Sequence, residues 1–217
     1  MAVFALEENE IYFPDPTLAE DDGLLAVGGD LSLERLILAY SNGIFPWYNE
    51  GDPIMWWCPK ERFIIRPDKI HVSHSMKKFM RKHSVSITIN RDFADTMHRC
   101  RLKREFDEGT WITDDMEKAY FALHEKNFAV SVEATIDGEL AGGLYGVCLG
   151  KCFFGESMFS DKENGSKVAL IMFSSVLAHN DFVMIDCQFH TDHLESMGGE
   201  RIGWEEYRRL LDKGLGL

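Results

Sequence analysis

The sequence of 217 residues predicts an α+β fold, with a small irregular N-terminal domain at 1–62 and a larger domain with a mixed sheet at 63–217. Two observations lead to this prediction. Gly and Pro are dense in the first sixty residues and leave room for little regular structure. From residue 129 onwards, strand-length apolar segments surround one apolar helix-length segment, a pattern typical of helices packed on a sheet.

Helices are predicted where capping residues and apolar spacing agree. One spans 33–42, with Ser32 as its N-cap and Gly43 just past its end. Others are predicted at 75–83, at 92–104 and directly after Thr113, a further capping residue. The helix at 166–179 is apolar nearly all round, so we expect it to be buried, and an amphipathic helix spans 204–213.

Strands are predicted from alternating or continuous short apolar runs at 85–89, 129–136, 140–149, 151–159 and 182–188. Asp137 and Gly138 form a tight-turn signal between two of these runs and predict a hairpin there.

The composition excludes several classes of protein. Hydrophobic residues at 45% and charged residues at 27% are ordinary for a globular chain. The N-terminus carries no signal-peptide pattern and the apolar runs are too short for a membrane span, so we expect a cytoplasmic protein without membrane contact. The five cysteines form no C-x-x-C pair, which favours reduced thiols over a disulfide framework.

The net charge of −13 is unevenly distributed along the chain. Between Lys60 and Arg104 there are 13 Lys and Arg against 4 Asp and Glu, a local balance of +9, which leaves −22 on the remainder. This segment is either a solvated basic face or a surface for a phosphate backbone. Within it, Lys77, Lys78, Arg81 and Lys82 share one helix face, and Arg99, Arg101, Lys103 and Arg104 are candidates to extend it.

Polar residues follow two apolar strands and are candidates for chemistry. Glu156 comes directly after an apolar run, where desolvation would raise its pKa, and Asp186 and Gln188 end another run. The alternative is that these side chains simply point into water. Trp47, Trp111, Phe153 and Phe173 are either core residues or the wall of a pocket that receives an apolar side chain or a terminal base.

Other patterns are weaker. Cys187, His190 and His193 have a spacing that would suit zinc but lack a fourth ligand, so no metal is predicted. Ser157 lacks the G-x-S-x-G context of a nucleophile elbow. The segment 162–167 does not match a P-loop.

Ordered blocks along nearly the whole chain resemble the leucyl/phenylalanyl-tRNA–protein transferase family. They include Phe13-Pro14-Asp15-Pro16, Ala39-Tyr40, Gly43-Ile44-Phe45-Pro46-Trp47, Pro53-Ile54-Met55-Trp56-Trp57, Gly109-Thr110-Trp111-Ile112-Thr113, Gly142-Gly143-Leu144-Tyr145-Gly146, Phe154-Gly155-Glu156-Ser157-Met158-Phe159-Ser160, Ser166-Lys167, Ile185-Asp186-Cys187-Gln188 and His193-Leu194. The chain departs from the family pattern at Cys58, where Ser is usual, and at Gly165, where Ala is common.

The resemblance implies a C-terminal acyltransferase domain like that of the N-acetyltransferase (GNAT) superfamily. It implies transfer of Leu or Phe, and less efficiently Met, from aminoacyl-tRNA to proteins that begin with Arg or Lys, which marks them for N-degron proteolysis. No cofactor is expected, and the enzyme is expected to be a monomer.

By the same resemblance, Asp186, Gln188 and Glu156 are the catalytic residues. The donor would be bound by Trp47, Trp111, Phe153, Met158, Ser160, Leu170, Phe173 and Ile185. The helix face of Lys77, Lys78, Arg81 and Lys82 would bind tRNA. Two alternatives from the residues stay open: an acetyltransferase that uses acetyl-coenzyme A, with Lys162 and Gly165 as a faint pyrophosphate loop, and a non-catalytic RNA-binding protein.

Overall fold

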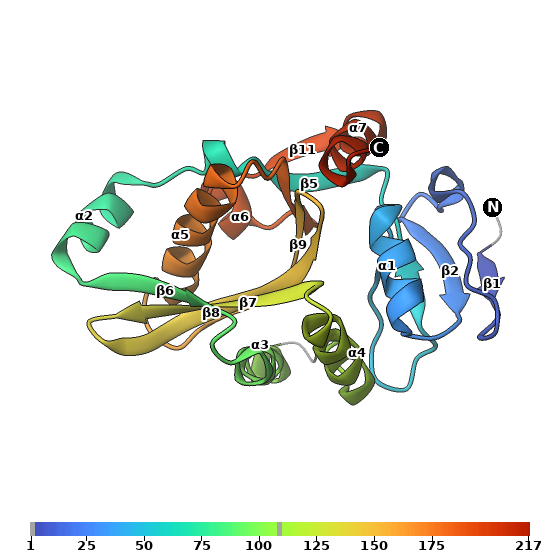
Figure 1. The fold of residues 1–217 in the computed structure, drawn as a ribbon, viewed down its shortest axis with the longest axis horizontal. Coiled ribbons are helices and arrows are strands. Elements are labelled where there is room, and N and C mark those ends of the chain that lie inside the picture. The colour runs from blue at the N-terminus through green and yellow to red at the C-terminus, as the bar shows by residue number, and fades with distance from the viewer. Residues whose placement is uncertain (1–2, 108–109) are drawn as a thin grey trace.

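The computed structural model describes residues 3–107 and 110–217, apart from the side chains of residues 104–107. The chain builds a small sheet near its N-terminus and a large sheet from most of the remainder (Figure 1). Gly109 of the Gly109–Thr113 motif and the side chain of Arg104 lie outside the described residues.

The N-terminal sheet has four strands in the order β1-β2-β4-β3. They are β1 (Phe4–Leu6), β2 (Leu24–Gly28), β3 (Phe45–Pro46) and β4 (Met55–Trp57). This region is therefore more regular than the sequence predicts. Strands of two to five residues are too short to show an alternating pattern, so only their neighbours in space reveal them.

Helix α1 (Leu33–Ser41) confirms the predicted N-terminal helix and its caps. The Ser32 hydroxyl accepts the amide of Arg35, and Gly43 follows the helix with a φ of +73°. Leu36, Ala39 and Tyr40 are buried on its inner face. A 3₁₀ turn (Pro16–Leu18) precedes β2.

The large sheet has seven strands in the order β11-β5-β10-β9-β8-β7-β6. They are β5 (Glu61–Ile65), β6 (Val85–Ile89), β7 (Ala129–Ile136), β8 (Glu139–Leu149), β9 (Cys152–Ser160), β10 (Met184–Gln188) and β11 (Glu200–Gly203). Strands β6 to β9 pair antiparallel, whereas β10 lies parallel to β9. The predicted mixed sheet and the hairpin at Asp137 and Gly138 are confirmed; β5 and β11 are additions.

Helices cover both faces of this sheet. They are α2 (His74–Lys82), α3 (Phe93–Asp107), α4 (Asp114–Glu125), α5 (Gly165–His179), α6 (Asp192–Ser196) and α7 (Trp204–Leu215), with a 3₁₀ turn at Pro67–Lys69. Helix α5 lies on one face, while α3 and α4 lie on the other (Figure 1). All the helices predicted for this domain are present, and the short α6 is an addition.

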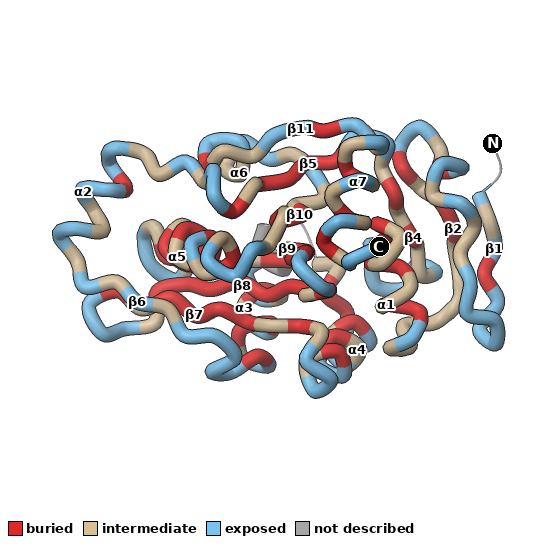
Figure 2. Tube along the Cα trace, turned by 45° about the horizontal axis from the view of Figure 1, so that its top comes forward, coloured by how far each residue is buried: buried red, intermediate tan, exposed pale blue. Residues whose placement is uncertain are grey.

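The core follows this layering. One cluster lies between the sheet and α5, and includes Leu144, Phe153 and Ile185. The other lies beneath the opposite face and continues into the N-terminal sheet, where it includes Tyr40 and Trp56. Buried segments run along β7, β8 and α5, while α2 is largely exposed (Figure 2). Among the described helices, none has the length and apolarity to cross a bilayer.

The close approach of α5 to β8 yields a testable prediction. A Cβ built on Gly142 would lie 2.6 Å from the carbonyl carbon of Gly165 and 2.7 Å from the amide nitrogen of Ser166. Because both are backbone atoms, Gly142→Ala should reduce the free energy of unfolding by about 1–3 kcal/mol. The melting temperature should fall by roughly 2–4 °C for each kcal/mol.

Gly203→Ala is the matched control, because no atom lies within 4 Å of its added Cβ. It replaces the N-cap of α7 and should cost about 1 kcal/mol at most. Equal melting temperatures for the two variants would contradict a tight contact at Gly142.

Candidate functional site

The site is created where β9 and β10 separate. The two strands pair in parallel over three positions, ending at Phe154 and Asp186. Beyond that point each strand has a bulge against its other neighbour, β9 against β8 and β10 against β5. These bulges place Glu156 and Gln188 at the point of divergence, and a cavity of about 380 Å³ opens there.

The cavity has an apolar wall and an aromatic wall. The apolar wall comes from the large sheet and α5 and consists of Leu144, Phe153, Met158, Leu170 and Ile185. The aromatic wall consists of Trp47, Trp111 and Phe189. Trp47 approaches Trp111 edge-on with ring centroids 6.3 Å apart and lies 5.4 Å from Phe189. Trp47 is 40% exposed, so this wall reaches the surface.

The cavity brings together six of the eight residues expected to bind the donor, namely Trp47, Trp111, Phe153, Met158, Leu170 and Ile185. The other two do not line it. Phe173 stands behind Phe153, which it meets edge-on at 5.0 Å. The Ser160 hydroxyl accepts the amide of Ser166 at 3.1 Å and donates to the carbonyl of Lys162, so it organises the first turn of α5 instead.

Glu156 is buried at the polar end of the cavity and accepts three hydrogen bonds. Its Oε1 accepts from the hydroxyl of Tyr40 at 2.8 Å and from the side-chain amide of Gln188 at 2.9 Å. Its Oε2 accepts from the hydroxyl of Tyr120 at 3.2 Å. Burial raises the pKa of Glu156 to about 7, although the hydrogen bonds from both tyrosines oppose this shift. The predicted desolvation of this carboxylate is thus present.

The two tyrosines are site residues that the sequence analysis does not identify. Tyr40 comes from α1 and Tyr120 from α4, and their hydroxyl oxygens lie within hydrogen-bond distance of each other. Tyr40 belongs to the family motif Ala39-Tyr40, which is a usable signal. Tyr120 gives none, because it occupies an apolar helix position that is equally typical of a core residue.

Asp186 is fully buried, and its carboxylate does not line the cavity. Arg62 donates to both oxygens at 2.9–3.1 Å, and the Tyr207 hydroxyl donates to Oδ2 at 2.8 Å. The remaining contact is the backbone amide of Gln188, 2.8 Å from Oδ1. Asp186 is therefore linked to the cavity through Gln188, and its expected catalytic role stays a prediction.

The basic helix α2 lies at the end of the molecule opposite the N-terminal sheet (Figure 1). Lys77, Lys78, Arg81 and Lys82 are all exposed, and none forms an ion pair with any described residue. The predicted extension onto α3 is not supported. Arg99 pairs with Asp95 and Asp161, and α3 lies on the face of the sheet opposite α5, whereas α2 packs with α5.

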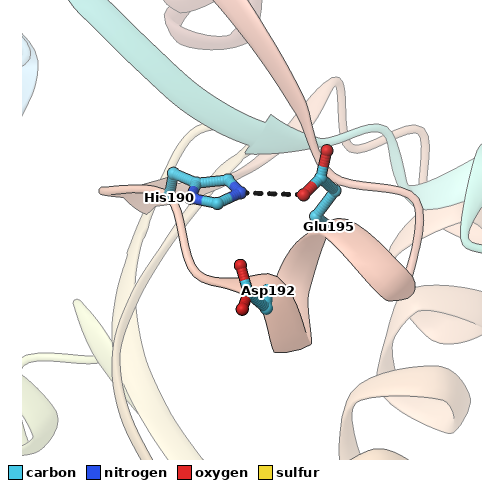
Figure 3. A group of neighbouring side chains, drawn as sticks. All are labelled: His190, Asp192 and Glu195. Carbon is cyan, nitrogen blue, oxygen red and sulfur yellow. Dashed lines mark hydrogen bonds and ion pairs between the residues drawn. The ribbon is translucent and has the colours of Figure 1, made fainter.

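The zinc pattern does not form a site among the described residues. The metal-ligating atoms that come together are those of His190, Asp192 and Glu195 rather than those of Cys187, His190 and His193. Figure 3 shows the imidazole of His190 turned toward Glu195, whose Oε2 lies 2.9 Å from Nε2. Both carboxylates are exposed, and such groups are common without a metal, so we assign none.

Comparisons with known proteins agree over nearly the whole chain. Residues 64–212 match the family model described as leucyl/phenylalanyl-tRNA protein transferase, and residues 29–60 match the model of its N-terminal domain. A protein of Desulfatibacillum aliphaticivorans named leucyl/phenylalanyl-tRNA–protein transferase is 54% identical over 92% of this chain and 86% of its own length. One with the same name from Syntrophus aciditrophicus is 52% identical over 94% and 86%.

Among solved structures, the PaiA N-acetyltransferase of Thermoplasma acidophilum is similar in part. Its TM-score is 0.32 at 12% identity, covering 45% of this chain and 75% of that one. At this score the likeness supports no functional inference.

The family matches and the cavity between two walls define an enzyme of the aminoacyltransferase class. More particularly, the chain belongs to the leucyl/phenylalanyl-tRNA–protein transferase family.

The raised pKa of Glu156 predicts a pH dependence of stability. Because the folded protein holds this proton more tightly than the unfolded chain, stability should fall as the pH rises from about 4.5 to about 7 and then level off. This difference in pKa between the folded and unfolded states corresponds to roughly 3 kcal/mol in the free energy of unfolding. Glu156→Gln, which cannot ionise, should lack this component.

Urea unfolding of both proteins at pH 5 and pH 8 measures it. The stability of the wild type relative to Glu156→Gln should be lower at pH 8 than at pH 5. A relative stability that does not change with pH would show that Glu156 titrates as an ordinary carboxyl group.

Proposed function

We propose that this enzyme moves Leu or Phe, and less efficiently Met, from aminoacyl-tRNA to the N-terminal Arg or Lys of acceptor proteins and so marks them for N-degron proteolysis. The observation that carries this proposal is the cavity at the β9–β10 divergence. Its apolar wall suits an aromatic side chain or an aliphatic one without a β-branch, and its polar end presents Glu156 and Gln188 beside that wall.

The aromatic wall supports a nucleoside next to the aminoacyl group. Trp47 and Trp111 stand at the same cavity, and aromatic rings stack on bases without regard to sequence. The proposed division at residue 62 assigns Pro46 and Trp47 to the first domain and every other cavity residue to the second. The cavity therefore lies where the proposed domains meet.

The chemistry needs an oriented amine and a place for one proton. The acceptor's α-amine attacks the ester carbonyl, the new C–N bond forms, the C–O bond to the ribose breaks, and the 3′-hydroxyl leaves with a proton. The ester is already activated, so positioning supplies much of the rate. Because Gln188 donates its amide N–H to Glu156, its carbonyl oxygen is turned away and is available to accept an N–H of the amine.

The proposed acceptor class is supported by charge. Six carboxylates line a groove formed by residues 8, 29–31, 48–54 and 113–115, namely those of Glu8, Asp30, Glu50, Asp52, Asp114 and Asp115. Segment 48–54 begins directly after Trp47, and segment 113–115 begins two residues after Trp111. Asp30, Asp114 and Asp115 already pair with Arg35, Arg101 and Lys118. The carboxylates of Glu8, Glu50 and Asp52 would therefore be the ones that attract a basic N-terminal residue and repel an acidic one.

The alternative donor, acetyl-coenzyme A, is disfavoured at the start of α5. A pyrophosphate group there would need free backbone amides. The amides of Gly165 and Ser166 are already bonded to the Lys162 carbonyl and the Ser160 hydroxyl, and that of Val168 to the Asn164 carbonyl.

A transfer assay tests the proposal. Purified protein should transfer radiolabelled Phe from Phe-tRNA to a peptide that begins with Arg, and more slowly Met from Met-tRNA. A peptide of the same sequence that begins with Asp serves as the matched control and should remain unmodified. Acetylation from acetyl-coenzyme A, or equal labelling of both peptides, would contradict the donor or the acceptor assignment respectively.

The exposed cations of α2 are proposed to bind the tRNA backbone. Replacing Lys77, Lys78, Arg81 and Lys82 with Ala should raise the Michaelis constant for Phe-tRNA and leave transfer from phenylalanyl-adenosine nearly unchanged. Phosphate contacts position a nucleic acid without reading its sequence, which suits an enzyme that accepts different tRNAs. For every phosphate that the variant no longer neutralises, the slope of log affinity against log salt should become shallower by about 0.7–0.9.

A pair of double variants controls for charge. Replacing Lys78 and Lys82 with Ala should weaken tRNA binding. Replacing Lys118 and Lys126 with Ala removes the same amount of charge from exposed positions at α4. Equal effects of the two double variants would show that α2 acts only through net charge and is not a binding surface.

A further inference from the structure

Gln188 has a backbone conformation that needs support. Its φ of +62° lies in the left-handed region, which costs a residue with a side chain roughly 1–2 kcal/mol. It also follows the bulge at which β10 shifts its register against β5. The backbone amide of Gln188 donates a hydrogen bond to the carboxylate of Asp186, which closes a local turn two residues long. The direction of the Gln188 side chain thus depends on where the Asp186 carboxylate stands.

Two residues from distant parts of the chain fix that carboxylate. Arg62, from β5, contacts both oxygens, and Tyr207, from α7, donates to Oδ2. Arg62 also donates to the Tyr207 oxygen at 3.3 Å, so the three side chains form a closed ring of contacts. All three are at most 1% exposed, so water does not compete for these bonds.

The guanidinium of Arg62 is itself clamped between two rings. Its central carbon lies 4.7 Å from the ring centroid of Phe45, in the N-terminal sheet, and 4.7 Å from that of Tyr207. Gly43 leaves the room that this arrangement requires, because a Cβ there would lie 2.6 Å from the Tyr207 ring. Phe45 in turn meets Phe189 of the cavity wall edge-on at 5.5 Å.

We propose that Arg62 and Tyr207 are positioning residues for the transfer reaction. They hold Asp186 in one orientation, Asp186 holds the backbone of Gln188 in its left-handed turn, and Gln188 is thereby aimed at Glu156 and the attacking amine. This inference rests on the proposed function, in which Gln188 contacts that amine. Neither residue reaches the cavity, so each acts on the reaction through Asp186 and Gln188.

Tyr207→Phe is the sharpest test, because it keeps the ring over Arg62 and removes only the hydroxyl. Loss of a hydrogen bond to a buried charged group changes an equilibrium constant by about tenfold to hundredfold. We therefore expect the kcat of Phe transfer to fall by about tenfold. The KM values for Phe-tRNA and the Arg peptide should stay within about threefold, because the cavity walls are untouched.

Arg62→Lys should lower kcat further, because an ammonium group cannot bond both carboxylate oxygens in the same plane. Thr96→Val is the matched control. Thr96 of α3 is also buried, and its hydroxyl donates to the carboxylate of Glu133 at 3.2 Å, away from Gln188. Its kcat should equal that of the wild type. If Arg62→Lys fails to fold, the Tyr207→Phe result decides.

A double-mutant cycle separates positioning from a merely structural role. If Tyr207 acts through Gln188, then Tyr207→Phe should lower kcat in the wild type but have no further effect in Gln188→Ala. Hydrogen exchange should show faster exchange of the Gln188 amide in Tyr207→Phe, with the amide of Ile185 unchanged.

Reductions in kcat that multiply in the double variant would overturn the proposal, as would a Tyr207→Phe enzyme with wild-type kcat. Transfer by the wild type is measured first in every series. Absence of transfer to the Arg peptide by the wild type would count against the proposed function, whereas an active wild type with an equally active Tyr207→Phe variant would count against this inference alone.

Discussion

The separation of β9 from β10 is the constraint on which the site depends. Two parallel strands that stayed paired would bury their backbone groups in a ladder and leave no space between their side chains. Here pairing stops after three positions, and bulges on both strands turn Glu156 and Gln188 toward each other. The same divergence opens the cavity, so its apolar wall and its polar end arise from one feature of the sheet.

Opening a sheet in its middle exposes polar groups to a largely dry interior, and the structure compensates with extensive hydrogen bonding. The carboxylate of Glu156 receives three donors, and that of Asp186 receives Arg62, Tyr207 and a backbone amide. Burial opposes the charged form of Arg62, but the neighbouring carboxylate of Asp186 favours it and holds the pKa of Arg62 above its usual value. A buried charge without such partners would cost several kcal/mol, so the site and the stability of the domain are built from the same contacts.

Positive and negative charge lie on different parts of the surface. The basic helix α2 stands at one end of the molecule (Figure 1), whereas the acidic groove is lined by N-terminal segments and by the start of α4. The cavity lies between the N-terminal sheet and the large sheet. An enzyme that brings a polyanionic donor and a basic acceptor together gains from such an arrangement, because each partner is attracted to a different part of the surface. If α2 binds the tRNA as proposed, an overall charge of −13 is compatible with a tRNA donor.

The sequence by itself determined the helices, the main strands, the charge pattern and the ordered motifs of the family. These are local properties: a cap such as Ser32, a turn such as Asp137-Gly138 and an apolar period are each written within a few adjacent residues. Only the tertiary structure decided which polar residues meet. It joined Tyr40 and Tyr120 to Glu156, placed Ser160 and Phe173 outside the cavity wall, and buried Asp186 against Arg62 and Tyr207. Residues 62, 186 and 207 are brought together by strand order and by the docking of α7, and no short-range pattern encodes contacts that span 21 to 145 positions.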